Sequence, residues 1–244
     1  MVIGRGLIER IAVISDKYQL IFVHNPKCAG SSIKNALQGL PEADWRKNDW
    51  HYTINQLFRT GDKIEDIFDY KSFGCVRNPY DRLVSAFTYN IERVLISTDY
   101  HWDAYPLAYQ CLKKYTDQYL TGLDGSWGGT DLIKTFRAFV LSEDFEKLTG
   151  KGWPIHFKLQ SHFFTERDLD LCLRFEDFME QDGGLEALED YTGQSLKVPY
   201  TNMSAHPDYQ EFYDIQCMDR VAKKYHSDFI EFGYNIHMLG ESHA

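Results

Sequence analysis

Residues 19–40 contain a short apolar run, a turn of small residues and a helical pattern, in that order. The apolar run covers residues 19–24 and is rich in β-branched and aromatic side chains, which predicts a buried strand. Small residues fill the turn at 25–32, and apolar residues then recur at helical spacing. We therefore expect a helix that begins near Ser31 and is capped by Ser31 or Ser32.

A strand–turn–helix unit of this kind can hold a phosphate at the start of its helix. The first amides of a helix have no acceptor inside the helix, and the helix dipole adds partial positive charge there. Lys27 supplies a full positive charge, and the two serines supply hydroxyl donors. The alternative is an ordinary strand-to-helix turn with a solvated lysine. The turn is not a Walker A loop, because Lys27 precedes Gly30 instead of following the last glycine.

A second phosphate site is predicted in residues 72–95. Residues 72–77 have the pattern of a strand, and Asn78 can cap the helix that follows. Arg77 at the strand end and Ser85 two turns into the helix can face one ligand. A guanidinium group and a hydroxyl suit a phosphate. The alternative is a surface arginine and a serine that packs against another helix.

Together the two motifs resemble those of sulfotransferases that use 3′-phosphoadenosine-5′-phosphosulfate (PAPS). The resemblance implies that the first motif binds the 5′-phosphosulfate group, and that Arg77 and Ser85 bind the 3′-phosphate. The residues that match the first motif are Pro26, Lys27, Cys28, Ala29, Gly30, Ser31 and Ser32. Cys28 departs from the family, which usually has threonine there, and it leaves a thiol near the site. Two separate anionic sites also suit PAPS better than ATP, whose phosphates form one row.

His51 is the predicted general base. It lies between the two motifs, where family-2 (carbohydrate-type) sulfotransferases place a catalytic histidine ahead of a short helix. An imidazole suits proton removal, since its pKa lies near neutrality. The alternatives are a polar loop histidine with no catalytic role, or a carboxylate such as Asp49 or Glu42 as the base.

The last third of the chain carries a further match to these sulfotransferases. Residues 157–164 resemble the segment that carries a glutamine before the final core strand. Residues 171–177 alternate as a strand and match an Arg-Phe-Glu element of the family. Arg174 in this element either reaches the nucleotide or pairs with Glu176 or Asp177.

The resemblance is thinnest between residues 96 and 155. Residues 99–119 are rich in tyrosine and tryptophan. Such side chains can line an acceptor pocket, but they more often pack in a core, so we expect packing.

Composition limits the possible partners and compartments. The net charge of −10 argues against nucleic-acid binding. The five cysteines include no C-x-x-C pair, which favours a reduced, cytoplasmic protein without structural disulfides. No apolar run reaches the roughly 18 residues of a membrane span, and no metal-ligand spacing is evident, so neither a membrane nor a metal is predicted.

The sequence therefore predicts an α/β protein with a central, mostly parallel sheet flanked by helices, related to P-loop nucleotide kinases. We expect one sulfotransferase domain over residues 1–244, with its core at about 19–236. The predicted reaction moves a sulfuryl group from PAPS to a hydroxyl or amine of a small-molecule acceptor, such as a natural product, and leaves the desulfated nucleotide PAP. Lys27 would stabilise the developing charge. The alternatives are a carbohydrate O-sulfotransferase, an ATP-using P-loop kinase and a non-catalytic PAPS sensor. No oligomeric state is predicted.

Overall fold

The computed structural model describes residues 13–41, 69–96, 105–120, 129–150, 153–179, 183–197 and 206–237. The chain divides into two compact units, each with its own hydrophobic core. The first unit combines Met1–Val76 with Gln160–Asn202, and the second combines Arg77–Leu159 with Met203–Ala244. The single domain over residues 1–244 stays a prediction.

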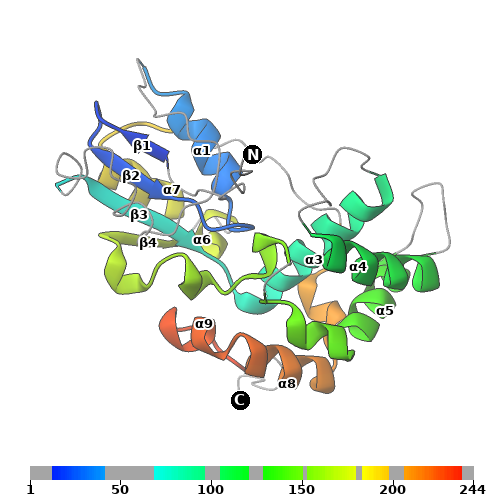
Figure 1. Cartoon of the computed structure of the whole chain (residues 1–244). Helices are drawn as coiled ribbons and strands as arrows, with labels where there is room; N and C mark the ends of the chain where they lie inside the picture. The colour runs from blue at the N-terminus through cyan, green and yellow to red at the C-terminus, as the bar shows by residue number, and fades with distance from the viewer. Residues whose placement is uncertain are drawn as a thin grey trace, which may run out of the picture. The chain divides into compact units, whose positions relative to one another are not determined.

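A four-stranded sheet forms the centre of the first unit, and its strands lie side by side in sequence order (Figure 1). Strand β1 is antiparallel to β2, while β2, β3 and β4 are parallel. The register pairs Phe22 with Phe73, and Cys75 with Leu173. The strands are β1 (Val13–Ser15), β2 (Leu20–Val23), β3 (Lys71–Val76) and β4 (Leu171–Arg174). The predicted α/β fold with a mostly parallel sheet is confirmed.

Strand β2 is buried along its whole length, as its apolar sequence predicts. Its four side chains are each at most 2% exposed. Strands covered on both faces have continuous apolar sequences of this kind. The rings of Phe22 and Phe73 stack with their centroids 5.1 Å apart, which ties β2 to β3 on one face.

That face of the sheet packs against the helices of the first unit. These helices are α1 (Gly30–Gln38), α6 (Phe175–Met179) and α7 (Gly184–Thr192). Ile33 and Leu37 of α1 share one buried cluster with Leu188 of α7 and with the aromatic rings of the strands. The helical spacing seen in the sequence therefore marks the buried stripe of α1.

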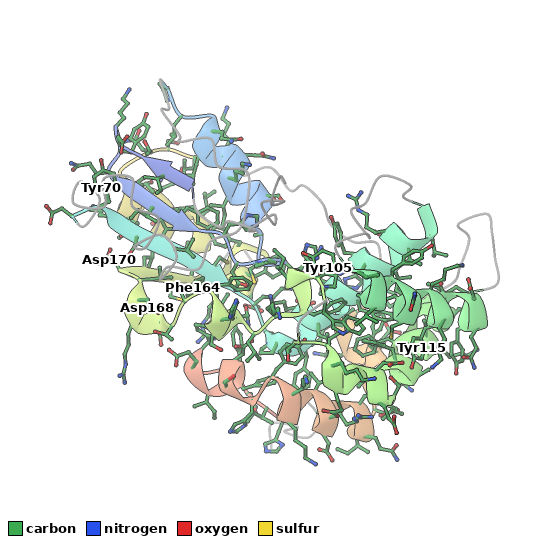
Figure 2. The ribbon with its side chains drawn as sticks, in the orientation of Figure 1. Tyr70, Tyr105, Tyr115, Phe164, Asp168 and Asp170 are labelled. Atoms are coloured by element: carbon green, nitrogen blue, oxygen red, sulfur yellow. The ribbon has the colours of Figure 1, made fainter. Side chains whose placement is uncertain are left out.

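The opposite face is covered by the segment that leads into β4. A Cβ built on Gly74 would lie 2.8 Å from the Phe164 ring and 2.8 Å from a Leu169 methyl group. Only a glycine at this position lets that segment approach the strand so closely. Phe164 is labelled in Figure 2.

At the end of the sheet where the parallel strands begin, β3 and β4 are joined by hydrogen bonds to Asp170, the residue before β4. Its carboxylate accepts from the backbone N–H of Ser72 at 2.7 Å and from the Ser72 hydroxyl at 2.9 Å. The Tyr191 hydroxyl contacts the same oxygen at 3.4 Å. Asp170 and Tyr70 lie at this end of the sheet in Figure 2. These bonds lower the pKa of Asp170, led by the backbone bond from Ser72.

The second unit is built from helices around an aromatic core. Phe87, Phe136, Phe139 and Tyr115 contact one another edge-on or stacked within this core. Tyr115, labelled in Figure 2, is 4% exposed, so packing is the role of this tyrosine from the aromatic stretch. The α-helices are α3 (Pro79–Ile96), α4 (Pro106–Tyr119), α5 (Gly129–Val140), α8 (Ile215–Lys224) and α9 (His226–Glu231), and short 3₁₀ helices connect several of them.

Candidate active site

The loop at residues 25–29 follows β2 and has a strained backbone. Lys27 has φ 67° and Ala29 has φ 57°, so both lie in the left-handed region although neither is glycine. Each such residue costs about 1–2 kcal/mol relative to the right-handed conformation. Strain of this kind clusters at ligand clamps. Turns that mix left- and right-handed residues also direct backbone N–H groups into concave surfaces that bind anions.

Helix α1 begins at Gly30, one residue earlier than predicted, and its cap is Ala29. The first helical bond runs from the Ile33 N–H to the Ala29 carbonyl at 3.0 Å. Capping by Ser31 or Ser32 was therefore a wrong prediction, since no side chain caps this helix. The left-handed Ala29 turns the chain into the helix before either serine is reached, and both serines lie in the first turn. That turn contains no acidic residue, which suits an anion.

His24 lies against the first residue of α1. A Cβ built on Gly30 would lie 1.9 Å from Cδ2 and 2.0 Å from Nε2 of the His24 ring. The ring also stacks on Phe22, with centroids 5.9 Å apart. An imidazole nitrogen is thus held beside the start of the helix, next to the loop that carries Lys27.

Two buried side chains of the 25–29 loop, Asn25 and Cys28, meet the buried side chain of Gln160. Asn25 Nδ2 donates to the Gln160 Oε1 atom at 3.0 Å and to the Cys75 carbonyl at 3.2 Å. The Cys28 thiol donates to Gln160 Oε1 at 3.3 Å. Asn25, Cys28 and Gln160 are at most 1% exposed. The loop is therefore anchored to β3 and to the segment that contains Gln160.

In the second unit, Arg77 forms a two-point ion pair with Asp81. Arg77 Nε and Nη2 each lie 2.7 Å from a different oxygen of the Asp81 carboxylate. Both residues are 9% exposed. The bond uses two of the five guanidinium donors and fixes the plane of the group. Arg77 follows β3 directly in the chain.

Ser85 lies on the same face of α3 as Asp81, one turn further along the helix. It is 3% exposed. The helix starts as the sequence predicts, because Asn78 Oδ1 accepts from the Tyr80 N–H at 3.0 Å and Pro79 is the first helical residue. One short helix segment thus carries Ser85 and the carboxylate that holds Arg77.

A model of the sulfotransferase family matches residues 10–235 of the chain. The chain belongs to the sulfotransferase family. No curated protein and no solved structure matches it in the other two comparisons. The family membership that the two motifs predicted is confirmed. No helix among the described residues of this sulfotransferase is both long and apolar enough to cross a membrane.

Arg174 is the last residue of β4 and pairs in register with Val76. The strand predicted at 171–177 ends here, and helix α6 starts at Phe175. Glu176 and Asp177 therefore lie in the first turn of that helix, where acidic side chains favour the positive end of the helix dipole. The role of Arg174 in this sulfotransferase stays a prediction.

His51 and its rivals Asp49 and Glu42 lie outside the described residues. The general base therefore stays a prediction. The loop predicted to resemble a phosphosulfate site is described in full, and so are Arg77 and Ser85.

Sequence reasoning assigned no role to three residues that shape the 25–29 loop and the surroundings of Arg77: His24, Asp81 and Gln160. Asp81 had a visible signal, because it lies in the first turn of the predicted helix, close in sequence to the arginine at the end of the preceding strand. His24 had only its position at the strand end, beside the loop. Gln160 had the family resemblance of its segment but no local signal of what it would contact.

Proposed function

We propose that this sulfotransferase moves a sulfuryl group from PAPS to a hydroxyl or amine of a small-molecule acceptor. The observation that carries the proposal is the 25–29 loop. Two of its residues, Lys27 and Ala29, have left-handed backbone conformations, and Lys27 also supplies a positive charge. The loop leads directly into helix α1, whose first turn contains no acidic residue. These features suit a phosphate that gains charge as the bond to sulfur breaks.

Lys27 and the amides of residues 28–32 would hold the 5′-phosphosulfate group. The acceptor atom attacks sulfur, the bond from sulfur to the bridging oxygen breaks, and PAP leaves with that oxygen on its 5′-phosphate. Negative charge therefore grows on the bridging oxygen. A preorganised ammonium and fixed amides stabilise this charge more than the charge of the ground state.

Arg77 and Ser85 would bind the 3′-phosphate of PAPS. The ion pair with Asp81 supports this role, because it holds the guanidinium in one plane before the ligand arrives. A group that is already ordered loses less conformational entropy on binding. Arg174 is included in the proposed nucleotide site from its family element.

His51 would take the proton that the acceptor loses, and the imidazolium would release it to water afterwards.

The proposed acceptor is defined only by its chemical class. A natural-product alcohol is preferred here over a sulfated polymer, since the net charge of −10 disfavours a polyanionic acceptor.

A reducing compartment such as the cytoplasm is also proposed, because none of the five cysteines forms a disulfide.

The test incubates the purified chain with PAPS and a panel of alcohols, amines and oligosaccharides, and follows PAP release and acceptor mass. A parallel reaction contains ATP and Mg²⁺. Calorimetry with PAP and with adenosine measures binding without needing the acceptor. We expect PAP to bind far more tightly than adenosine, and one acceptor of the panel to gain a sulfuryl group.

Each alternative has its own outcome. Sulfation of an oligosaccharide alone identifies a carbohydrate O-sulfotransferase. Phosphoryl transfer from ATP identifies a kinase. Tight PAPS binding with no PAP release in any reaction indicates a sensor. A protein that binds PAP no better than adenosine contradicts the proposal altogether.

A further inference from the structure

We infer that Gln160 is a positioning residue of the 25–29 loop, holding it in the geometry that binds the 5′-phosphate through hydrogen bonds to Asn25 and Cys28. The inference rests on the proposed function for the identity of the ligand. The contacts themselves join residues 135 and 132 positions apart in the chain. All of them lie within the first unit.

Donors and acceptor are matched in number around Gln160 Oε1. Gln160 Oε1 has two lone pairs, and it receives two donors, Asn25 Nδ2 and the Cys28 thiol. Asn25 Nδ2 has two hydrogens, and they go to Gln160 Oε1 and to the Cys75 carbonyl. The thiol also lies 3.5 Å from the Pro26 carbonyl, so its single hydrogen can be shared between two acceptors.

These partners also fix the orientation of the Asn25 amide. Rotating that amide by 180° would place its oxygen against two other oxygens, Gln160 Oε1 and the Cys75 carbonyl. The observed orientation avoids this repulsion, although the Asn25 Oδ1 atom then has no hydrogen-bond partner among the described parts of the chain. Leaving a buried acceptor unsatisfied costs free energy, so we infer that the two hydrogen bonds from Nδ2 determine the orientation of the Asn25 side chain.

The hydrogen bond between Cys28 and Gln160, which anchors the loop, lies at the strained part of the loop. Cys28 is the residue between Lys27 and Ala29, the two left-handed positions. A contact that fixes Cys28 therefore restrains both backbone conformations, and with them the N–H groups that would face the phosphate. Without the anchor the loop can relax to conformations without strain, and each of those directs the amides elsewhere.

This role explains why cysteine is accepted at position 28. The position needs a small side chain that can donate one hydrogen bond to Gln160, and a thiol does so. A hydroxyl can also donate this bond, whereas a methyl group cannot. The matched substitutions are therefore Cys28→Ser, which keeps a donor, and Cys28→Ala, which removes it.

The experiment measures the binding of PAP and of adenosine 3′-phosphate by calorimetry. The second ligand lacks the 5′-phosphate that the loop would hold. We expect Cys28→Ala to weaken PAP binding about tenfold, the scale of one lost buried hydrogen bond. Gln160→Met removes the acceptor of two bonds and should weaken PAP binding at least as much. Adenosine 3′-phosphate should change by less than about twofold, because the loop does not contact it. Cys28→Ser keeps a donor and should bind PAP more tightly than Cys28→Ala.

A double variant and a control complete the design. Gln160→Met with Cys28→Ala should lose little more than Gln160→Met alone, since the glutamine change already removes the bond to Cys28. Tyr191→Phe is the control, because it removes a hydrogen bond at the other end of the sheet. It should lower thermal stability without changing PAP affinity.

The outcomes separate the inference from the proposed function. Wild-type protein that fails to bind PAP overturns the proposed function and with it the ligand named here. Wild-type binding that survives unchanged in both Gln160→Met and Cys28→Ala overturns the inference alone. Equal losses for both ligands also overturn it, because they indicate general destabilisation. If Gln160→Met does not fold, the comparison of Cys28→Ala with Cys28→Ser decides.

Discussion

The imidazole ring of His24 occupies the space that a side chain on Gly30 would need. Gly30 does not require an unusual φ, so the glycine is needed for close approach and not for backbone freedom. The contact ties the end of β2 to the first turn of α1. The start of the helix is thereby fixed relative to the 25–29 loop.

Gly30→Ala should destabilise the protein by about 1–3 kcal/mol, the range for overpacking a buried site. The new methyl group meets the His24 ring, and the ring has to rotate away. Chemical denaturation measures this loss. Gly39→Ala is the comparison and should cost less than Gly30→Ala, since its Cβ would lie 3.3 Å from the Ala36 carbonyl oxygen, a tight contact but a much longer one than the 1.9 Å at Gly30. The double variant His24→Ala with Gly30→Ala should recover part of the loss. Stability equal to that of the wild type in Gly30→Ala would show that the close approach does not exist.

Lys27→Ala should reduce turnover by roughly 10²–10³-fold, the effect of losing one charge-stabilising donor in a transition state. PAPS affinity should fall much less, because the charge on the bridging oxygen develops during the reaction. Steady-state kinetics with saturating PAPS separates the two effects. Lys27→Arg keeps a positive charge and should retain more activity than the alanine variant. A near-normal kcat in Lys27→Ala would remove Lys27 from the reaction.

Arg77→Ala should weaken PAP binding by about 1.5–3 kcal/mol, the value of a hydrogen bond to a charged group. Adenosine 5′-phosphosulfate, which lacks the 3′-phosphate, should be affected far less, and Ser85→Ala should show the same selectivity. Arg77→Ala also leaves the Asp81 carboxylate buried without its partner, which lowers stability. Arg77→Ala with Asp81→Ala should recover stability without recovering PAP affinity. Equal losses for the two ligands would contradict the assignment of the 3′-phosphate.

His51→Ala should nearly abolish sulfuryl transfer while PAP binding stays intact, because the phosphate sites do not need the imidazole. A positioned base contributes typically about 10²–10⁴-fold. The wild-type rate should rise with pH through one ionisation in the imidazole range, since only neutral histidine accepts a proton. That ionisation should be missing in His51→Ala and His51→Gln. Its persistence, or a carboxylate-range ionisation in the wild type, would point to Asp49 or Glu42 instead.

Asp170→Ala should lower the free energy of unfolding by about 1 kcal/mol at neutral pH, which is less than the roughly 1.5–3 kcal/mol of a hydrogen bond to a charged group because the site is exposed. The Ser72 bonds lower the pKa of Asp170 in the folded protein. Its stabilisation is therefore complete above the ordinary carboxyl pKa and is lost as pH falls through the lowered folded value. The difference between wild type and variant should shrink in acid, as denaturation at several pH values can measure. A difference that stays constant down to the lowest pH would exclude the ionised form as the cause.

The strand, the loop and the helix around residues 19–40 could be predicted because their signals are local. An apolar run, small residues and helical spacing each depend on neighbours only a few positions away. The same holds for Asn78, whose side chain caps the helix that begins at the next residue. The cap of α1 was predicted wrongly, because Ala29 takes up a left-handed conformation that its residue type does not favour.

The sequence by itself determined the family, the mostly parallel sheet and the positions of the two motifs that are predicted to bind phosphate, since these follow from local pattern and motif order. Only the tertiary structure decided what holds the motifs in shape. The Gln160 contact to Cys28 spans 132 positions, and Gly30 owes its identity to a ring that packs over it. Such contacts depend on where distant side chains meet after folding, and no local periodicity records that. The strained backbone at Lys27 also depends on the tertiary structure, because a left-handed conformation of a lysine persists only where surrounding contacts hold it.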